Sequence, residues 1–225
     1  MKNANKNLIN WDQINTVLLD MDGTLLDLHF DNYFWLHYVP ECYAKKNNIS
    51  FGEAHQYLIP KFKAIEGTMN WYCVDYWTKE LDLDIAILKD QISHLIQLRP
   101  DVLEFLDWLK IQGKKRILVT NAHQKSLDIK LKKTPLGSYL DQIISAHELG
   151  LPKEESEFWT KLHSITHYDP SSTLFIDDNA QVLQSAKDYG IKHLLAISKP
   201  DSKQPQKIFN GFLAIDHFSE VFNSE

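Results

Sequence analysis

Short apolar runs alternate along this chain with segments whose apolar residues recur at helical spacing. The helical spacing is clearest over 102–109, and it also predicts helices over 126–134, 155–167 and 180–189. Strands that alternate with helices indicate a parallel, doubly wound α/β sheet of the Rossmann-like type. The apolar runs predict buried strands at Ile14–Leu19, Arg116–Thr120, Gln142–Ser145, Thr173–Ile176, His193–Ile197 and Phe212–Ile215.

The segment Leu28–Leu98 has a different character from the rest of the chain. It is rich in aromatic residues, and its spacing predicts helices only, over 31–47, 51–63, 69–81 and 84–98. Ser50 and Glu53 have the spacing of a capping box at the start of the second of these helices. The pattern therefore predicts an α/β core of residues 1–27 and 99–225, interrupted by a helical insertion of residues 28–98.

Composition narrows the classes of protein to consider. The 225 residues are 44% hydrophobic with a formal net charge of −6, which fits a globular protein and argues against a binding surface for nucleic-acid polymers. Cys42 and Cys73 lack metal-ligand spacing, so we expect reduced thiols. The polar N-terminus and the absence of an apolar run of about 20 residues predict no membrane partner and a cytoplasmic location.

Chemically active side chains lie where the predicted strands end. The carboxyl ends of parallel strands share one edge of a sheet, and ligands bind there. Several carboxylates at one site repel one another unless a cation joins them, and an all-oxygen set suits Mg²⁺. The side chains are Asp20 and Asp22 after the first strand, Thr120 after the second, Asp177 and Asp178 near the fourth, and Lys153 in a loop.

The run Asp20-Met21-Asp22-Gly23-Thr24 resembles the first motif of the haloacid-dehalogenase (HAD) superfamily in its phosphatase form. The resemblance implies a HAD core with a small helical cap at 28–98. It also implies Mg²⁺-dependent hydrolysis of a phosphomonoester, most closely dephosphorylation of GMP or IMP. The segments Thr16–Trp35, Asn70–Trp77, Arg116–His123 and Thr173–Asp178 are similar to bacterial purine 5′-nucleotidases that act on GMP and IMP.

The same resemblance implies a role for each matching residue. Asp20 would attack phosphorus and form an aspartyl-phosphate. Asp22 would protonate the leaving oxygen and then activate water. Gly23, Thr120, Asn121 and Lys153 would bind the phosphate, and Lys153 would also offset negative charge. Asp20, Asp178 and the Asp22 backbone carbonyl would hold Mg²⁺, with Asp177 beside it directly or through water.

Several of these residues have simpler interpretations. Asp177 and Asp178 could cap the helix that starts near Ala180. His123 is more typical of a solvated turn than of a catalyst. The loop 199–202 could reach the edge of the site, but it is expected to be solvated. Asp31 and Asn32 could cap a helix or bond a substrate hydroxyl, and the aromatic residues of the insertion could form its core or stack on a purine.

Other functions also remain open at this point. The chain could be a phosphatase for a sugar phosphate or phosphoglycolate. It could be a haloacid dehalogenase, although that chemistry needs neither a metal nor an acid at Asp22. It could be a non-catalytic scaffold. We expect a small-molecule partner, and either a monomer or a small homo-oligomer.

Overall fold

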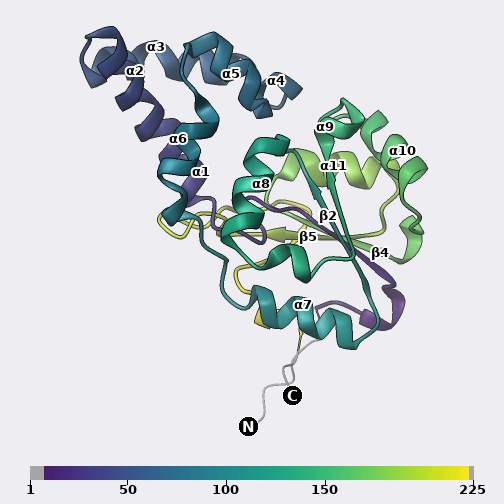
Figure 1. The fold of residues 1–225 in the computed structure, drawn as a ribbon. Coiled ribbons are helices and arrows are strands. Elements are labelled where there is room, and N and C mark those ends of the chain that lie inside the picture. The colour runs from purple at the N-terminus through teal and green to yellow at the C-terminus, as the bar shows by residue number, and fades with distance from the viewer. Residues whose placement is uncertain (1–7, 223–225) are drawn as a thin grey trace.

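The computed structural model describes residues 8–222, which contain one six-stranded sheet whose neighbouring strands all run parallel (Figure 1). The strands lie in the order β3-β2-β1-β4-β5-β6. The predicted parallel, doubly wound sheet is therefore confirmed. The strands are β1 (Thr16–Leu19), β2 (Lys115–Thr120), β3 (Gln142–Ser145), β4 (Thr173–Asp177), β5 (His193–Ile197) and β6 (Leu213–Ile215).

Helices cover both faces of the sheet because the buried strands are apolar on both sides. Val17 and Leu19 share a core with α7 (Val102–Ile111) and α8 (Gln124–Lys133). Leu18 and Phe175 pack on the other face against α9 (Ala146–Leu149), α10 (Ser156–Ile165) and α11 (Ala180–Tyr189).

The strand register fixes where the chain leaves the sheet. Leu19 at the end of β1 pairs with Leu118 of β2 on one side and with Ile176 of β4 on the other. The next residue, Asp20, therefore lies between the ends of β2 and β4, and its backbone N–H donates to the Ile176 carbonyl at 3.0 Å. The strand order reverses at this point, where open α/β sheets bind ligands.

The segment after β1 folds into helices, and α2, α3, α4 and α5 stand away from the sheet (Figure 1). Together with α1 and α6 we refer to them as the cap helices. The predicted capping box of Ser50 and Glu53 is present at the start of α3. The cap helices are α1 (His29–Tyr33), α2 (Val39–Asn47), α3 (Phe51–Ala64), α4 (Met69–Tyr72), α5 (Val74–Leu81) and α6 (Ile85–Gln91), with a π-helical turn at Phe34–Tyr38.

Two predicted helices of this region were wrong in extent. The helix expected over 69–81 is divided at Cys73, whose extended backbone starts a second helix, because Thr68 and Cys73 each accept a hydrogen bond from the turn that follows. The helix expected over 84–98 ends at Gln91 and continues as the 3₁₀ turn Ser93–Leu95.

The division into a core (1–27 and 99–225) and a cap (28–98) stays a prediction, and it includes residues outside 8–222.

Two further features concern the helices and the cysteines. No helix within residues 8–222 combines the length and the apolar character that crossing a bilayer requires. Cys42 and Cys73 are free thiols, as the sequence predicted.

Candidate active site

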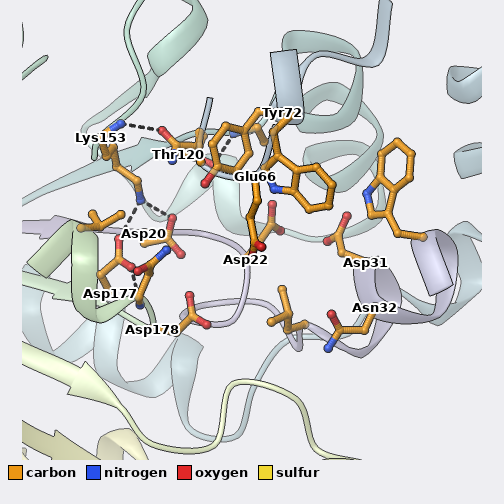
Figure 2. A pocket seen from close by; sticks show the side chains of 18 of the residues that line it. Asp20, Asp22, Asp31, Asn32, Glu66, Tyr72, Thr120, Lys153, Asp177 and Asp178 are labelled. Carbon is orange, nitrogen blue, oxygen red and sulfur yellow. Dashed lines mark hydrogen bonds and ion pairs between the residues drawn. The ribbon is translucent and has the colours of Figure 1, made fainter. Parts of the chain in front are cut away.

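A cavity of about 700 Å³ lies where the ends of the central strands face the cap helices (Figure 2). Asp20, Thr120 and Asp178 line it from the sheet edge. Trp35 and Trp71 line it from the cap helices. The residues that the sequence predicted at strand ends therefore meet in one pocket, and Figure 2 shows their side chains converging there.

Lys153 links the strand ends at the base of this cavity. Its Nζ lies 2.6 Å from Asp20 Oδ1, 2.7 Å from Asp177 Oδ2 and 3.2 Å from the Val119 carbonyl oxygen. Its backbone N–H donates to Asn121 Oδ1 at 3.0 Å, which fixes the loop that carries it. The lysine is 2% exposed, so burial disfavours its charge. The carboxylates of Asp177 and Asp20 outweigh burial and raise the pKa of Lys153, which stays cationic.

Asp20 combines burial with an unpaired oxygen. Burial raises the pKa of Asp20 to about 6, although the ammonium group of Lys153 opposes this shift. One carboxylate oxygen is held by Lys153, while Oδ2 is buried and has no hydrogen-bond partner among residues 8–222. A buried polar atom of this kind is costly unless a ligand satisfies it. Asp20 Oδ2 is therefore the oxygen of this carboxylate that is available to bind a cation or a phosphoryl group.

Three carboxylates meet at this edge of the sheet. Asp20, Asp177 and Asp178 each offer an oxygen within 4.8 Å of the others. Both oxygens of Asp177 already accept hydrogen bonds, from Lys153 Nζ at 2.7 Å and from the Asn179 N–H at 2.8 Å. Asp20 and Asp178 therefore have more freedom to bind an ion, and the oxygen donors fit Mg²⁺.

Gly23 is required by the close approach of Asp178. Its φ of +90° is in the range that favours glycine. A Cβ built on Gly23 would lie 2.7 Å from Asp178 Cγ, which is closer than atoms can pack. The Asp178 carboxylate therefore packs directly against the backbone of the turn that follows β1.

Asp22 belongs to a second ionic group that the sequence did not predict. Lys130 Nζ lies 2.6 Å from Asp22 Oδ1 and 2.7 Å from Asp31 Oδ2, and Lys89 Nζ lies 2.7 Å from Asp31 Oδ1. Burial raises the pKa of Asp22 to about 6 against the effect of Lys130. Burial also acts to raise the pKa of Asp31, but Lys130 and Lys89 outweigh it and hold that pKa below its usual value. Asp22 therefore takes up a proton more readily than an ordinary aspartate does, whereas the neighbouring Asp31 stays ionised.

Contacts at the second strand end reach the cap helices. Thr120 Oγ1 accepts from the Ala122 N–H at 3.0 Å, so the hydroxyl stays at the cavity wall. Asn121 Nδ2 donates to Glu154 Oε2 at 3.0 Å, and Tyr72 OH of α4 donates to Glu154 Oε1 at 2.6 Å. This chain of hydrogen bonds joins a cap helix to the loop that carries Lys153.

The structure decides several of the simpler interpretations. Asn179, rather than Asp177 or Asp178, caps α11, because its Oδ1 accepts from the Gln181 N–H at 2.9 Å. The expectation of a solvated loop at 199–202 was wrong: Asp201 is 2% exposed and accepts from Asn32 Nδ2 at 2.7 Å. Asn32 therefore fastens the base of the cap helices to this loop.

His123 and the aromatic residues also have clear positions. His123 is half-buried rather than solvated, and it caps α8 by accepting from the Lys125 N–H at 3.3 Å. Phe34 and Trp77 are buried in the core of the cap helices, which is the first of the two interpretations of the aromatic residues. Trp35 and Trp71 instead line the cavity, with ring centroids 6.2 Å apart and ring planes 28° apart.

Sequence reasoning missed Lys89, Lys130, Lys207 and Glu154. Lys207 Nζ lies 3.1 Å from Asp178 Oδ2. A signal for Lys130 was present, because it follows Leu127 by three positions and so lies on the buried face of α8. We find no comparable signal for the other three, whose partners are distant in sequence.

Comparison with known proteins gives a consistent picture. A model of the haloacid dehalogenase-like hydrolases matches residues 14–190. The GMP/IMP nucleotidase YrfG of Escherichia coli is 41% identical over 216 residues, which are 96% of this chain and 97% of that protein. Phosphoglycolate phosphatase 1 of Pseudomonas aeruginosa is 24% identical over 183 residues, 78% of this chain and 66% of that protein.

A solved structure of similar fold is the HAD phosphatase of Thermococcus onnurineus, with a TM-score of 0.75, 24% identity and coverage of 92% of this chain and 96% of that one. The comparisons confirm the resemblance drawn from the sequence. They also confirm the expected enzyme class, a hydrolase of phosphoric monoesters.

Proposed function

Because the chain belongs to the haloacid dehalogenase-like hydrolase family, we propose that it is a Mg²⁺-dependent 5′-nucleotidase that converts GMP or IMP to nucleoside and phosphate. The observation that carries the substrate class is the 41% identity to a GMP/IMP nucleotidase over nearly the whole of both chains. The geometry around Asp20 supports the reaction type, because its unpaired oxygen lies in a cavity beside a buried cation.

The reaction proceeds in two displacements at phosphorus. In the first, Asp20 Oδ2 forms a bond to phosphorus as the ester P–O bond breaks, and Asp22 gives its proton to the departing nucleoside oxygen. In the second, water attacks the phosphorus of the aspartyl-phosphate, Asp22 takes the proton from that water, and the Asp20 carboxylate is released with inorganic phosphate. The raised pKa of Asp22, about 6, suits a group that must both give and accept a proton.

Neighbouring residues position the phosphoryl group. Lys153 supplies a fixed positive charge beside the nucleophile. Thr120 presents its hydroxyl to the cavity, and the backbone N–H of Asn121, which also lines the cavity, would donate to a phosphate oxygen. The expected phosphate contact of Gly23 is not supported, because its N–H donates to the Leu26 carbonyl at 2.8 Å. Such donors stabilise the charge that develops on the transferring group.

Mg²⁺ fits the donors at this edge of the sheet. Asp20, Asp178 and the Asp22 backbone carbonyl would hold it, and Asp177 would act mainly by orienting Lys153, since both its oxygens are already bonded. When bound, the ion supplies positive charge that neutralises the phosphoryl oxygens.

The cap helices provide the contact surface for the rest of the substrate. Trp35 and Trp71 face the cavity, and aromatic faces stack on purine bases. A closed cap also excludes water that would compete for the phosphoryl group. We therefore propose that these two indoles favour a purine over a bare sugar.

A panel of phosphomonoesters tests this function. We expect kcat/KM for GMP and IMP to exceed the value for ribose 5-phosphate and phosphoglycolate, and Trp71→Leu to reduce that preference by about tenfold while the ribose 5-phosphate rate stays similar. Equal or faster turnover of sugar phosphates or phosphoglycolate would replace the nucleotide proposal with the alternative phosphatase. Chelation should remove all activity, and Mg²⁺ should restore it; full activity in excess chelator would reject the metal.

A further inference from the structure

A second group of metal-ligating side chains lies outside the acidic cluster, between the cap helices and the sheet. Cys73 precedes α5, His123 precedes α8, and His147 lies in α9. One sulfur or ring nitrogen from each lies within 4.8 Å of the others. The two imidazole rings have centroids 4.9 Å apart and are nearly perpendicular, at 83°. The thiol therefore comes from the cap helices, while both imidazoles come from the sheet side.

His147 has an unused ring nitrogen. Its Nε2 is buried and has no hydrogen-bond partner within the described part of the chain. Burial, with the nearby imidazole of His123, lowers the pKa of His147 to about 4, so the ring is neutral near pH 7. A neutral imidazole with an unpartnered ring nitrogen is the form of histidine that binds a metal ion.

His123 and Cys73 supply the other two ligand atoms of this cluster. His123 Nε2 lies 3.7 Å from Asp75 Oδ2, and burial lowers the pKa of His123 although that carboxylate opposes the shift. Cys73 is a half-buried free thiol whose Sγ accepts from the Tyr76 N–H at 3.4 Å. If a metal bound Nε2 of His123, Nδ1 would carry the ring proton, and the cap hydrogen bond from the Lys125 N–H to Nδ1 would be lost. The free energy of metal binding at a thiolate–imidazole site is larger than the stability lost with this one cap bond.

We propose that Cys73, His123 and His147 bind a thiophilic divalent cation, Zn²⁺, with the Asp75 carboxylate as the fourth ligand. Zn²⁺ favours four-coordinate sites built from Cys, His and carboxylate, whereas the all-carboxylate cluster at Asp20 favours Mg²⁺. The thiol proton passes to solvent when the cation binds. This site is independent of the proposed nucleotidase activity, because it uses none of the residues assigned to the reaction.

The position of the ligands gives this site a mechanical consequence. Cys73 and Asp75 belong to the cap helices, and His123 and His147 belong to the sheet side. A cation held by all four would fasten the cap helices to the core beside the cavity, which His123 also lines. Zn²⁺ therefore stabilises the closed arrangement.

Cobalt(II) provides a direct probe, because a thiolate ligand gives Co²⁺ a near-ultraviolet charge-transfer band. The protein is stripped with chelator, saturated with Mg²⁺ so that the acidic cluster is occupied, and titrated with Co²⁺. We expect the band to saturate at one equivalent and to disappear when Zn²⁺ is added. No band, or a band that survives in Cys73→Ser, would overturn the proposal.

Matched variants separate this site from others. Cys42→Ser removes the other thiol and should keep the band; loss of the band there would overturn the proposal. His147→Gln retains the thiol and should weaken Co²⁺ binding by more than about a hundredfold, beyond the 10- to 100-fold typical of an outer-shell group, so a smaller loss would contradict the proposal. Zn²⁺ should raise the midpoint of thermal unfolding of the wild type but not of Cys73→Ser. Asp20→Asn should retain the band even if the proposed nucleotidase activity is not found.

Discussion

Lys153 Nζ lies 2.6 Å from Asp20 Oδ1, although the two residues are 133 positions apart in the chain. The same nitrogen is bonded to Asp177 and to the backbone of β2. One buried ammonium group therefore holds together the ends of three central strands. It keeps Asp20 Oδ1 engaged, so that Oδ2 is the carboxylate oxygen without a hydrogen-bond partner in the part of the chain that the structure describes.

Replacement of this cation should damage catalysis more than binding. Lys153→Met leaves two buried carboxylates without their shared counter-charge, and we expect kcat for GMP to fall by at least about a hundredfold. Unfolding midpoints should also decrease, because a buried ion pair loses one partner. The exposed Lys161 gives the control variant Lys161→Met, which should behave as wild type in both assays. A Lys153→Met enzyme with kcat within a factor of two of wild type would contradict this role.

Gly23→Ala tests the contact with Asp178. The new Cβ would fall 2.7 Å from Asp178 Cγ, so that carboxylate must move. We expect the Mg²⁺ concentration for half-maximal activity to rise by about 10- to 100-fold. Gly113→Ala is the matched control, because Gly113 also has positive φ, at 68°, but nothing lies within 4 Å of its added Cβ. Equal Mg²⁺ dependence in the two variants would show that the contact is unimportant.

Asp31 should make the fold sensitive to acid. Lys130 and Lys89 outweigh burial and hold the pKa of Asp31 below its unfolded value near 4. The ionised carboxylate therefore stabilises the fold above about pH 4, and this contribution is lost as the pH falls toward the lower, folded value.

Urea unfolding of Asp31→Asn measures that contribution. At pH 7 the variant should lose about 3–5 kcal/mol of unfolding free energy, because two buried lysines lose a partner. The difference from wild type should shrink as the pH is lowered below about 4. Asp107→Asn, at an exposed position on α7, is the control and should show no such difference. A deficit that stays constant across this pH range would refute the ionic role of Asp31.

The hydrogen bond from Tyr72 to Glu154 should help to hold the cap helices against the core. Tyr72→Phe removes the 2.6 Å bond while it keeps the ring, so stability should change by only about 1 kcal/mol. KM for GMP should rise several-fold with little change in kcat, because the closed arrangement is less populated. Tyr57→Phe, on the exposed side of α3, should leave KM unchanged. An unaltered KM in Tyr72→Phe would count against this closure contact.

The strand ends could be predicted from sequence because each is a local signal. An apolar run that stops at Asp20, Thr120 or Asp177 identifies both the strand and the edge where it ends. The parallel arrangement then places these ends together with no further information. The positions of Asp20, Thr120 and Asp178 around one cavity follow from that logic, whereas Lys153 reaches the same cavity from a loop.

The ionic group around Asp31 shows why the rest could not be predicted. Lys89 belongs to a cap helix and Lys130 to a core helix, and only tertiary packing brings both to one carboxylate. Lys130 is buried while its neighbours Lys132 and Lys133 are exposed, so residue type alone does not distinguish them. Helix ends were also uncertain, since the break at Cys73 depends on a thiol acting as a helix cap.

The central claim is that Asp20 receives the phosphoryl group, and the most direct test is to locate that group on the protein. The wild type is mixed with GMP and Mg²⁺, quenched in acid within the first turnover, and digested for mass spectrometry. The account predicts a phosphorylated peptide that contains Asp20, is sensitive to hydroxylamine and is absent from Asp20→Asn. A phosphoryl group on a different side chain, or full-rate hydrolysis of GMP by Asp20→Asn, would contradict it.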